Sequence, residues 1–271
     1  MQSLYVVATP IGNLEDISLR ALRTLREVKL IAAEDTRKTK RLLTAYDIKT
    51  PMTSYYEHNK LTKLDYILDR LKEGDVALVS EAGTPGMSDP GYELILAANR
   101  SGIPVIPIPG ASAVITALIV SGLATDRFTY LGFLPRKAGN RRKLLESAAD
   151  DPGTIIILET PHRLTEALKD MLTVIGDRRI AVCRELTKLH EEVFRGSISQ
   201  AIEHFTEPRG EFTLVIEGMV ENHPAELNKD IRQQLQGMRL SGIKAKEAVA
   251  QVAGETGLSK KELYRAWLEQ A

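Results

Sequence analysis

Three loops rich in glycine, proline and small side chains follow predicted β-strands directly. They cover residues 9–14 (Thr-Pro-Ile-Gly-Asn-Leu), 81–91 and 109–113. Small side chains let a ligand approach the main-chain N–H and C=O groups closely. One such loop is usually only a turn. Ligands of open parallel sheets bind beyond the carboxyl ends of the strands, so three loops of this kind at one edge indicate a binding site.

The middle loop, residues 81–91, is the most informative of the three. It spans eleven residues between a predicted strand and a predicted helix, where about two to six usually suffice. It contains neither the pattern G-x-G-x-x-G nor G-x-x-x-x-G-K-[ST], so a dinucleotide or the phosphates of ATP are not the expected ligand. The loop favours a less anionic molecule.

Charged side chains gather at three other strand ends, in residues 34–37, 159–163 and 184–188. Alternating acidic and basic residues suit a polar substrate pocket, but an ordinary solvated surface also contains them. A compact basic patch is a further candidate for binding phosphates through charge and counterion release, with a plain surface as the alternative. It consists of Arg136, Lys137, Arg141, Arg142 and Lys143.

The elements that must position these residues alternate between short apolar runs and helical patterns, which is typical of a mostly parallel sheet covered by helices. The predicted strands of this part are residues 4–8, 30–33, 76–80 and 105–108, and the predicted helices are residues 18–28, 61–71, 91–100 and 111–124. Four later strands predict a second α/β domain, at residues 128–133, 154–159, 180–184 and 212–217.

The C-terminal part has a different character. A linker is expected over residues 218–227, followed by helices only, and Ser259 with Glu262 fits a capping box at the start of the last helix. Residues 246–254 and 259–268 predict a small helix-turn-helix. We therefore expect an α/β chain with domains at 1–120 and 121–221 that form a cleft, and a small helical domain at 222–271.

Composition limits the classes of function. The 271 residues are 43% hydrophobic and 27% charged, with 36 basic and 36 acidic side chains, so no global field would draw the chain to nucleic acid or membrane. The only cysteine is Cys183, and the histidines show no zinc-ligand spacing, so we expect no metal. No signal sequence or membrane span is recognisable, so we expect a cytoplasmic protein that does not engage a membrane.

Seven ordered motifs together resemble the tetrapyrrole methylase family, over essentially the full length of the chain. These motifs cover residues 7–14, 34–37, 80–91, 109–113, 132–135, 184–192 and 210–214. The resemblance is strongest to the branch that methylates ribosomal RNA. It implies a two-domain α/β fold with S-adenosylmethionine (SAM) in the cleft, a homodimer, and 2'-O-methylation of a cytidine in the decoding region of small-subunit ribosomal RNA.

The resemblance also implies positions for the methyl donor. Carried over motif by motif, they are Pro10, Ile11, Gly12, Gly83, Thr84, Met87, Asp89, Ser112, Ala113, Thr160 and Thr213. The chain departs from a common family pattern, because it has Gly-Thr-Pro where many relatives have Gly-Asp-Pro. The carboxylate expected beside SAM is thus replaced by Thr84, and we assign Asp89 as its substitute.

A ribose hydroxyl is a weak nucleophile, so a nearby proton acceptor would help its methylation. The candidates are Glu81, Glu185 and His162, whereas Lys188 or Arg37 would orient the ribose and phosphate or stabilise developing negative charge. For the helical tail we expect either RNA docking or a structural, dimer-stabilising role. The docking contacts would be Lys244, Lys246, Lys260, Lys261 and Arg265.

Two other functions remain open at this stage. One is methylation of a tetrapyrrole ring carbon, against which the helical tail and the basic patch argue. The other is a non-catalytic RNA-binding module that keeps a SAM pocket only as a relic of its fold.

Overall fold

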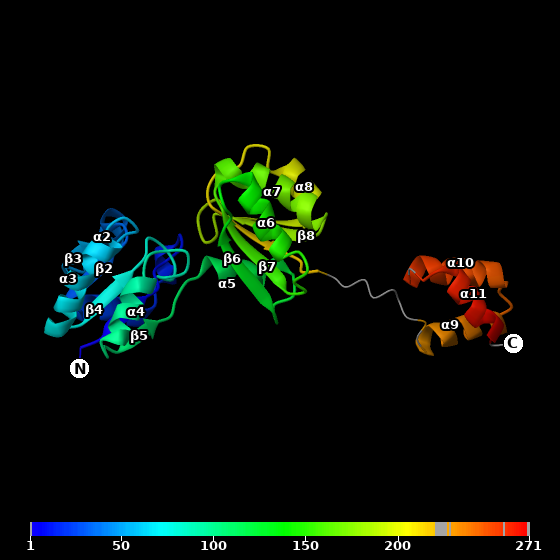
Figure 1. Cartoon of the computed structure of the whole chain (residues 1–271), viewed down its shortest axis with the longest axis horizontal. Helices are drawn as coiled ribbons and strands as arrows, with labels where there is room; N and C mark the ends of the chain where they lie inside the picture. Colours follow the sequence, from blue (N-terminus) through cyan, green and yellow to red (C-terminus); the bar gives the residue numbers. More distant parts are fainter. Residues whose placement is uncertain (1, 220–226, 228, 257, 270–271) are drawn as a thin grey trace. The chain divides into compact units, whose positions relative to one another are not determined.

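The computed structural model describes residues 2–219, 227, 229–256 and 258–269. The chain divides into two compact units, Met1–Met219 and Val220–Ala271. The first unit contains two five-stranded sheets and the second contains three helices (Figure 1). The predicted α/β fold with a C-terminal helical region is confirmed.

The first sheet has the strand order β3-β2-β4-β1-β5, and all its strands are parallel. Its strands are β1 (Leu4–Val7), β2 (Leu30–Ala33), β3 (Met52–Ser54), β4 (Val76–Val79) and β5 (Val105–Ile108). β1 lies between β4 and β5, so the loops that follow these three strands leave the same edge of the sheet side by side.

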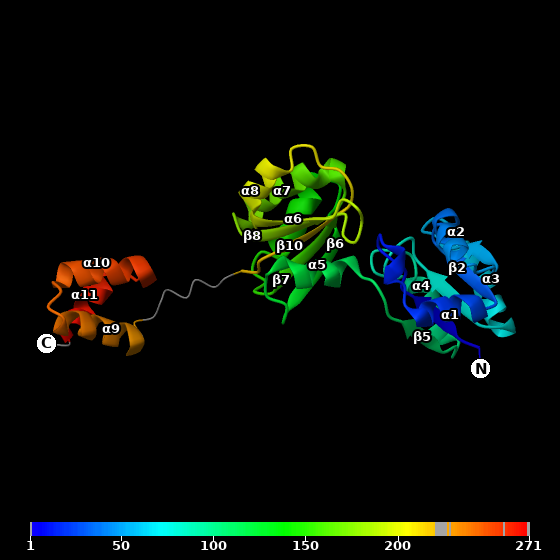
Figure 2. The same ribbon diagram turned by 180° about the vertical axis from the view of Figure 1, so that it is seen from behind.

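Helices cover both faces of this sheet. α1 (Leu19–Glu27) and α2 (Thr36–Ala45) pack on one face, where Figure 2 shows α1. α3 (Lys60–Glu73) and α4 (Tyr92–Arg100) pack on the other. Polar side chains fix where the first two helices begin, because Ser18 accepts the N–H of Ala21, and Asp35 accepts those of Arg37 and Lys38.

The second sheet is mixed, with the order β6-β7-β10-β8-β9. Its strands are β6 (Phe128–Phe133), β7 (Thr154–Glu159), β8 (Arg179–Arg184), β9 (Glu192–Ser197) and β10 (Phe212–Ile216). β6 runs parallel to β7, while β10 runs antiparallel to both of its neighbours.

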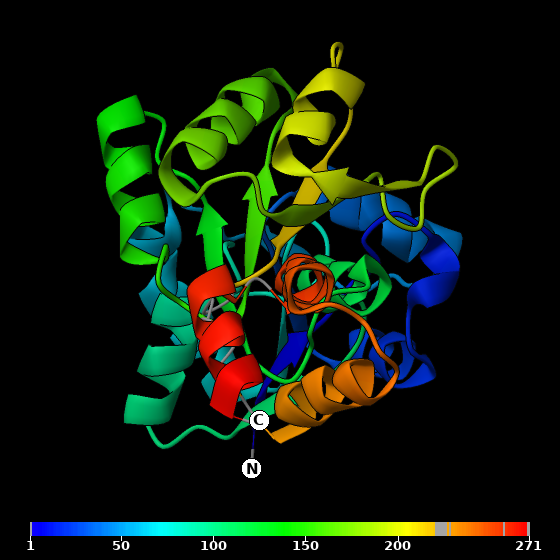
Figure 3. The same cartoon turned by 90° about the vertical axis from the view of Figure 1, so that its right-hand side faces the viewer.

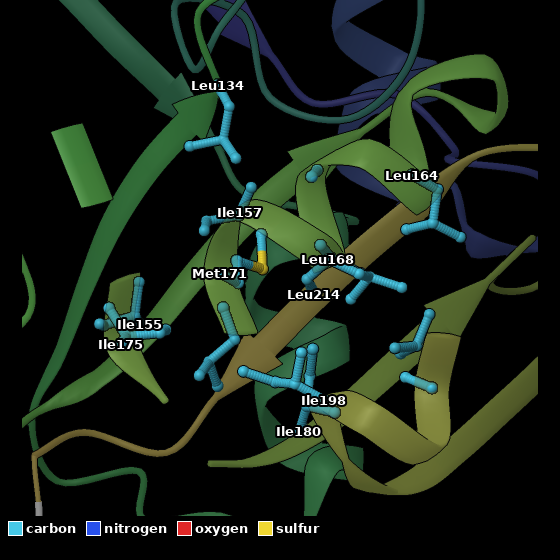
Figure 4. Packing of buried hydrophobic residues seen from close by; sticks show 14 of the residues in the cluster. Leu134, Ile155, Ile157, Leu164, Leu168, Met171, Ile175, Ile180, Ile198 and Leu214 are labelled. Carbon is cyan, nitrogen blue, oxygen red and sulfur yellow. The ribbon is translucent and has the colours of Figure 1, made fainter. Parts of the chain in front are cut away.

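Both faces of the second sheet are covered as well. α6 (Ala138–Ser147), α7 (Pro161–Ile175) and α8 (Ile198–His204) bury one face, with side chains such as Leu164, Leu168 and Met171 in the core of Figure 4. α5 (Ala113–Ser121) packs on the other face against β7, β8 and β10 (Figure 2). Its packing therefore groups α5 with the second sheet, although the predicted boundary at residue 120 placed it with the first.

The second unit has its own core. This unit consists of α9 (Lys229–Leu240), α10 (Ala245–Thr256) and α11 (Lys260–Glu269), the orange and red helices of Figure 3. These helices bury Leu235, Val252 and Leu263 among them. Ser259 accepts the N–H of Glu262 at 3.2 Å and donates to its carboxylate at 2.8 Å, which fixes the start of α11 as predicted. Most of the predicted linker, including the boundary at 221 and 222, lies outside the described residues.

The sequence analysis predicted no range for the helices α2, α6, α7, α8 and α9 or for the strands β3 and β9. α2 begins inside the charged segment at residues 34–37, which the sequence pattern indicated only as a cluster of charge at a strand end. Within the part of the chain that the structure describes, no helix combines the length and apolar character that a bilayer crossing requires.

Candidate functional site

The three small-residue loops converge. The main-chain N–H of Thr9 donates to Gly83 O at 2.8 Å, and Gly83 N–H donates back to Thr9 O at 3.0 Å. The hydroxyl of Thr84 donates to Ala111 O at 3.4 Å, which connects the second loop to the third. Gly83 has a φ of +74°, a conformation that a residue with a Cβ rarely adopts.

The first loop also packs against the second sheet, through the residues that follow β8. A Cβ on Gly12 would collide with the Lys188 side chain, and it would lie 2.8 Å from Thr187 Oγ1 and 3.0 Å from Leu186 O. The Asn13 N–H donates to the Thr187 hydroxyl at 3.1 Å. Gly12 therefore permits close packing of protein against protein.

A cavity of about 330 Å³, the main cavity, opens between the loops of the first sheet and the strand ends of the second. Its size falls in the usual range for small-molecule sites. The structure brings nine of the eleven predicted donor positions to its wall: Ile11, Gly83, Thr84, Met87, Asp89, Ser112, Ala113, Thr160 and Thr213. The other two, Pro10 and Gly12, line a neighbouring cavity.

The wall of the main cavity is acidic. It carries five carboxyl groups and, among the residues that line it, no lysine, arginine or histidine; the five are Glu34, Glu81, Asp89, Glu159 and Glu211. Burial, with Glu34 and Glu81 adding repulsion, raises the pKa of Asp89 to about 7. Burial likewise raises the pKa of Glu34. A cationic ligand would relieve this repulsion, whereas a phosphate would add to it.

The remaining wall is largely apolar. The apolar part of this wall suits a flat heterocycle. It includes Ile11, Val114, Phe133, Leu158, Leu186 and Phe212. A hydrogen bond of 2.7 Å between Ser88 and Tyr130 joins the long loop to β6. Cys183 also lines the cavity, but burial raises the pKa of its thiol to about 11, so it stays neutral and is a poor nucleophile near pH 7.

The acidic and apolar lining residues of the main cavity fit an S-adenosyl donor. One oxygen of the buried Glu159 carboxylate, Oε2, has no hydrogen-bond partner, and its residue lines the cavity. A ligand that carries hydroxyl, amine and sulfonium groups would meet these carboxylates. Three of them also pair with cations outside the lining of the main cavity: Glu81 with Lys38, Glu159 with Arg163 and Glu211 with Lys188. For metal binding, the described part of the chain contains no group of three or more histidine, cysteine or acidic residues with suitable positions.

A second cavity, of about 210 Å³, adjoins the main one and shares with it Ile11, Glu81, Ala82 and Glu211. We call it the α2 cavity. Its further lining residues are Thr9, Pro10, Gly12, Leu14, Lys38, Thr39, Arg41, Leu42, Ser80 and Lys188. Sequence reasoning did not select Lys38, Thr39 or Arg41, because α2 itself was not recognised.

Among the predicted catalytic residues, Glu81 and Lys188 lie at these cavities. Glu81 lines both and pairs with Lys38. Lys188 contacts Glu185 at 2.9 Å and Glu211 at 2.8 Å. Although burial opposes it, hydrogen bonds from Lys188 and the Glu211 N–H lower the pKa of Glu185, which makes this carboxylate a weak proton acceptor.

The other three candidates, Glu185, His162 and Arg37, are not among the residues that line either cavity. His162 and Arg37 have contacts of their own near the strand ends. His162 Nε2 is 3.4 Å from the Thr160 hydroxyl at the start of α7. Arg37 is exposed and pairs with Asp35 at 3.3 Å. Both therefore lie beside the site, with neither in its walls.

The predicted basic patch needs a correction at Arg141. This side chain is only 4% exposed, and its Nε contacts Asp170 on α7 at 2.6 Å, so a phosphate cannot reach it. Arg142 contacts the same carboxylate at 2.7 Å but remains half exposed. Arg136, Lys137 and Lys143 are exposed, as are Lys260, Lys261 and Arg265 in the second unit.

The doubly covered sheets, the acidic cavity between loops and strand ends, and the order of the motifs define one class of protein. The chain belongs to the family of tetrapyrrole (corrin/porphyrin) methylases, which matches residues 3–202.

Some members of this family share high sequence identity with this chain. The chain is 48% identical to ribosomal RNA small subunit methyltransferase I of Halalkalibacterium halodurans, with 99% of this chain and 95% of that protein aligned. It is 49% identical to the protein of the same name from Synechocystis, with coverages of 99% and 98%. The Thermotoga maritima protein of that name is 51% identical, and the alignment covers 80% of this chain and 99% of the relative.

Solved structures agree on the fold. A uroporphyrin-III C-methyltransferase from Thermus thermophilus, in complex with S-adenosylhomocysteine, superposes with a TM-score of 0.59. It covers 79% of this chain and 97% of its own, at 20% identity. At that identity the likeness concerns the fold alone.

Proposed function

We propose that this chain is a SAM-dependent methyltransferase that modifies small-subunit ribosomal RNA at the 2'-hydroxyl of a cytidine in the decoding region. The names of its relatives support the RNA substrate. The observation that carries the proposal is the main cavity, with five carboxylates and no cation among its lining residues. SAM bears a sulfonium, an ammonium and one carboxylate, so its net charge complements this wall.

The proposed donor site consists of the nine carried-over positions that line the main cavity, with the loops of the first sheet on one side and Thr160 and Thr213 on the other. Pro10 and Gly12 support it from the adjoining α2 cavity. The apolar wall would hold the adenine, and the acidic residues would face the ribose hydroxyls and the positive groups. When bound, SAM supplies a methyl group on a positively charged sulfur. The new bond joins this carbon to the ribose oxygen, the carbon–sulfur bond breaks, and the hydroxyl proton leaves to a base.

Glu81 is the candidate base that the geometry favours most. Its residue lines both cavities, so it lies at the wall shared by the proposed donor and acceptor sides. Lys38 on α2 pairs with its carboxylate and fixes its position at this shared wall. Lys188 is proposed to orient the acceptor, together with the Glu185 carboxylate that it contacts. His162 and Arg37 keep only an indirect role.

The proposed RNA contacts outside the cavities are the exposed cations. They are Arg136, Lys137, Arg142 and Lys143 in the first unit, and Lys260, Lys261 and Arg265 in the second. We also propose a homodimer, which the family resemblance implies, and a cytoplasmic location.

The test is incubation with methyl-labelled SAM and small ribosomal subunits, followed by mapping of the label. We expect label on one cytidine ribose. We expect Glu81→Gln to lower turnover by about 10²-fold and to lower SAM affinity far less. The turnover of Glu185→Gln and Lys188→Ala is measured in the same assay. Parental turnover in all three variants would contradict the assignment of the site, and label on a precursor tetrapyrrole instead of RNA would contradict the proposed function.

A further inference from the structure

The α2 cavity differs from the main cavity in charge. Three cationic side chains line it, Lys38, Arg41 and Lys188, against two carboxylates, Glu81 and Glu211. The main cavity has five carboxylates and no lining cation. Two adjoining cavities of opposite character suit two ligands of opposite charge.

Arg41 is the free positive charge of this wall. Lys38 pairs with Glu81, and Lys188 contacts both Glu185 and Glu211. Arg41 is exposed and has no ion-pair partner within the described residues. Lys38 and Arg41 are three residues apart on α2, so they project from the same side of the helix.

Two buried hydroxyl groups give independent support for a ligand here. Thr9 and Thr39 are each 4% exposed and both line the α2 cavity. The Oγ1 of each is buried without a hydrogen-bond partner. Buried hydroxyls are nearly always paired in folded proteins, so two unpaired ones at a single cavity wall indicate a polar ligand that supplies the missing bonds.

We infer that the α2 cavity binds the ribose and an adjoining phosphate of the acceptor nucleotide. Arg41 contacts the phosphate, and the hydroxyls of Thr9 and Thr39 bind polar groups of the sugar. The shared wall at Ile11 and Glu81 brings this ribose next to the main cavity, where the methyl donor is proposed to bind. The inference rests on the proposed function and adds to it the place of the acceptor.

The test compares Arg41→Ala with Lys40→Ala, which removes the same charge from the same helix at an exposed residue outside both cavities. With small subunits as substrate, Arg41→Ala should raise KM about tenfold, leave kcat within about threefold and leave SAM affinity unchanged. It should also reduce the slope of log affinity against log salt by about 0.7 to 1. Arg41→Lys should recover part of the loss, and Lys40→Ala should match the parent.

Equal KM values for Arg41→Ala and Lys40→Ala would overturn the inference. Weaker SAM binding in Arg41→Ala with an unchanged KM for the subunit would also overturn it, because the carboxylate of the donor would then occupy the cavity. If the parent protein methylates no RNA, the proposed function fails. The proposed ribose and phosphate site can then still be tested by titration with cytidine monophosphate in the presence of S-adenosylhomocysteine. Binding that depends on Arg41 would support the site, and no binding to the parent protein would overturn it.

Discussion

At the scale of single residues, Asp89 links the charge of the main cavity to pH. Burial and the neighbouring Glu34 and Glu81 raise its pKa to about 7, so the group is mostly protonated at pH 6 and mostly ionised at pH 8. A ligand with net positive charge binds the ionised form better. We therefore expect SAM affinity to rise between pH 6 and pH 8, by roughly fivefold, equivalent to about 1 kcal/mol.

Calorimetry in buffers of different ionisation enthalpy measures this directly, because SAM binding at pH 7 should release protons. Asp89→Asn should abolish most of the release and flatten the pH profile in this window. Glu34, whose pKa burial also raises, is the other group that could contribute. A profile in Asp89→Asn that is as steep as the parental one would assign the titration to Glu34 instead.

Gly12 supports the site through close packing within the protein. The sequence favoured close approach of a ligand, whereas the structure packs Gly12 against Lys188, Thr187 and Leu186 O. Gly12→Ala should therefore cost about 1–3 kcal/mol of stability through overpacking, and it should weaken SAM binding by displacing the neighbouring Ile11.

Thermal unfolding with and without SAM measures both effects. The control is Gly139→Ala on α6, where an added Cβ meets no atom within 4 Å, and a helical alanine should hold or raise stability. Equal melting temperatures in the two variants would refute the packing argument.

At the scale of elements, one carboxylate joins α6 to α7. Asp170 contacts the buried Arg141 at 2.6 Å and the half-exposed Arg142 at 2.7 Å. Asp170→Ala should lower the free energy of unfolding by about 3–5 kcal/mol, because it leaves the Arg141 charge buried without its main partner. Arg142→Ala removes a partly exposed partner of the same carboxylate and should cost only about 0–1 kcal/mol.

Denaturant unfolding of the two variants separates these values. Similar small losses would mean that Arg141 finds another partner, for which Glu166 at 3.7 Å is the nearest acidic group. The same contacts explain why Arg141 variants cannot test RNA binding, since any loss of affinity would be mixed with loss of folding.

The elements also show how far the sequence could be interpreted. Apolar runs predicted eight of the ten strands in the two sheets of the described chain, including β1, β4 and β5. The small-residue loops after these three strands supply nine of the residues that line the main cavity. β9 was missed because it is a partly exposed edge strand without a continuous apolar run. Strand order, and the packing of α5 on the second sheet, depend on contacts between distant residues that local pattern does not encode.

α2 shows the same limit at the site. Its buried residues, Thr39, Leu42 and Leu43, have helical spacing, but four cations among ten residues made the segment resemble a solvated surface. The α2 cavity could therefore not be predicted, although the segment 34–37 had been singled out for its charge. A helical interpretation of residues 36–45 would have brought Lys38 and Arg41 to one side.

At the scale of the whole molecule, the two units have separate cores. The main and α2 cavities are lined entirely by residues of the first unit, up to Thr213. The Thermotoga relative of the same name aligns with only 80% of this chain while covering 99% of its own length, and the first unit ends at Met219 of 271 residues. Because both cavities are lined within the first unit, we expect donor binding not to require the helical unit.

We therefore expect a chain that ends at Met219 to keep its fold and its SAM affinity, because each core is complete within its unit. If the helical unit docks RNA, KM for small subunits should rise in this truncated chain by roughly tenfold, with kcat nearly unchanged. The full-length variant with Lys260, Lys261 and Arg265 all replaced by alanine should show a smaller rise and a weaker dependence on salt, since these exposed cations would contact phosphates without reading sequence. An unchanged KM in both proteins would leave the helical unit a structural or dimer-stabilising role, and sedimentation of the truncated chain would then reveal a loss of self-association.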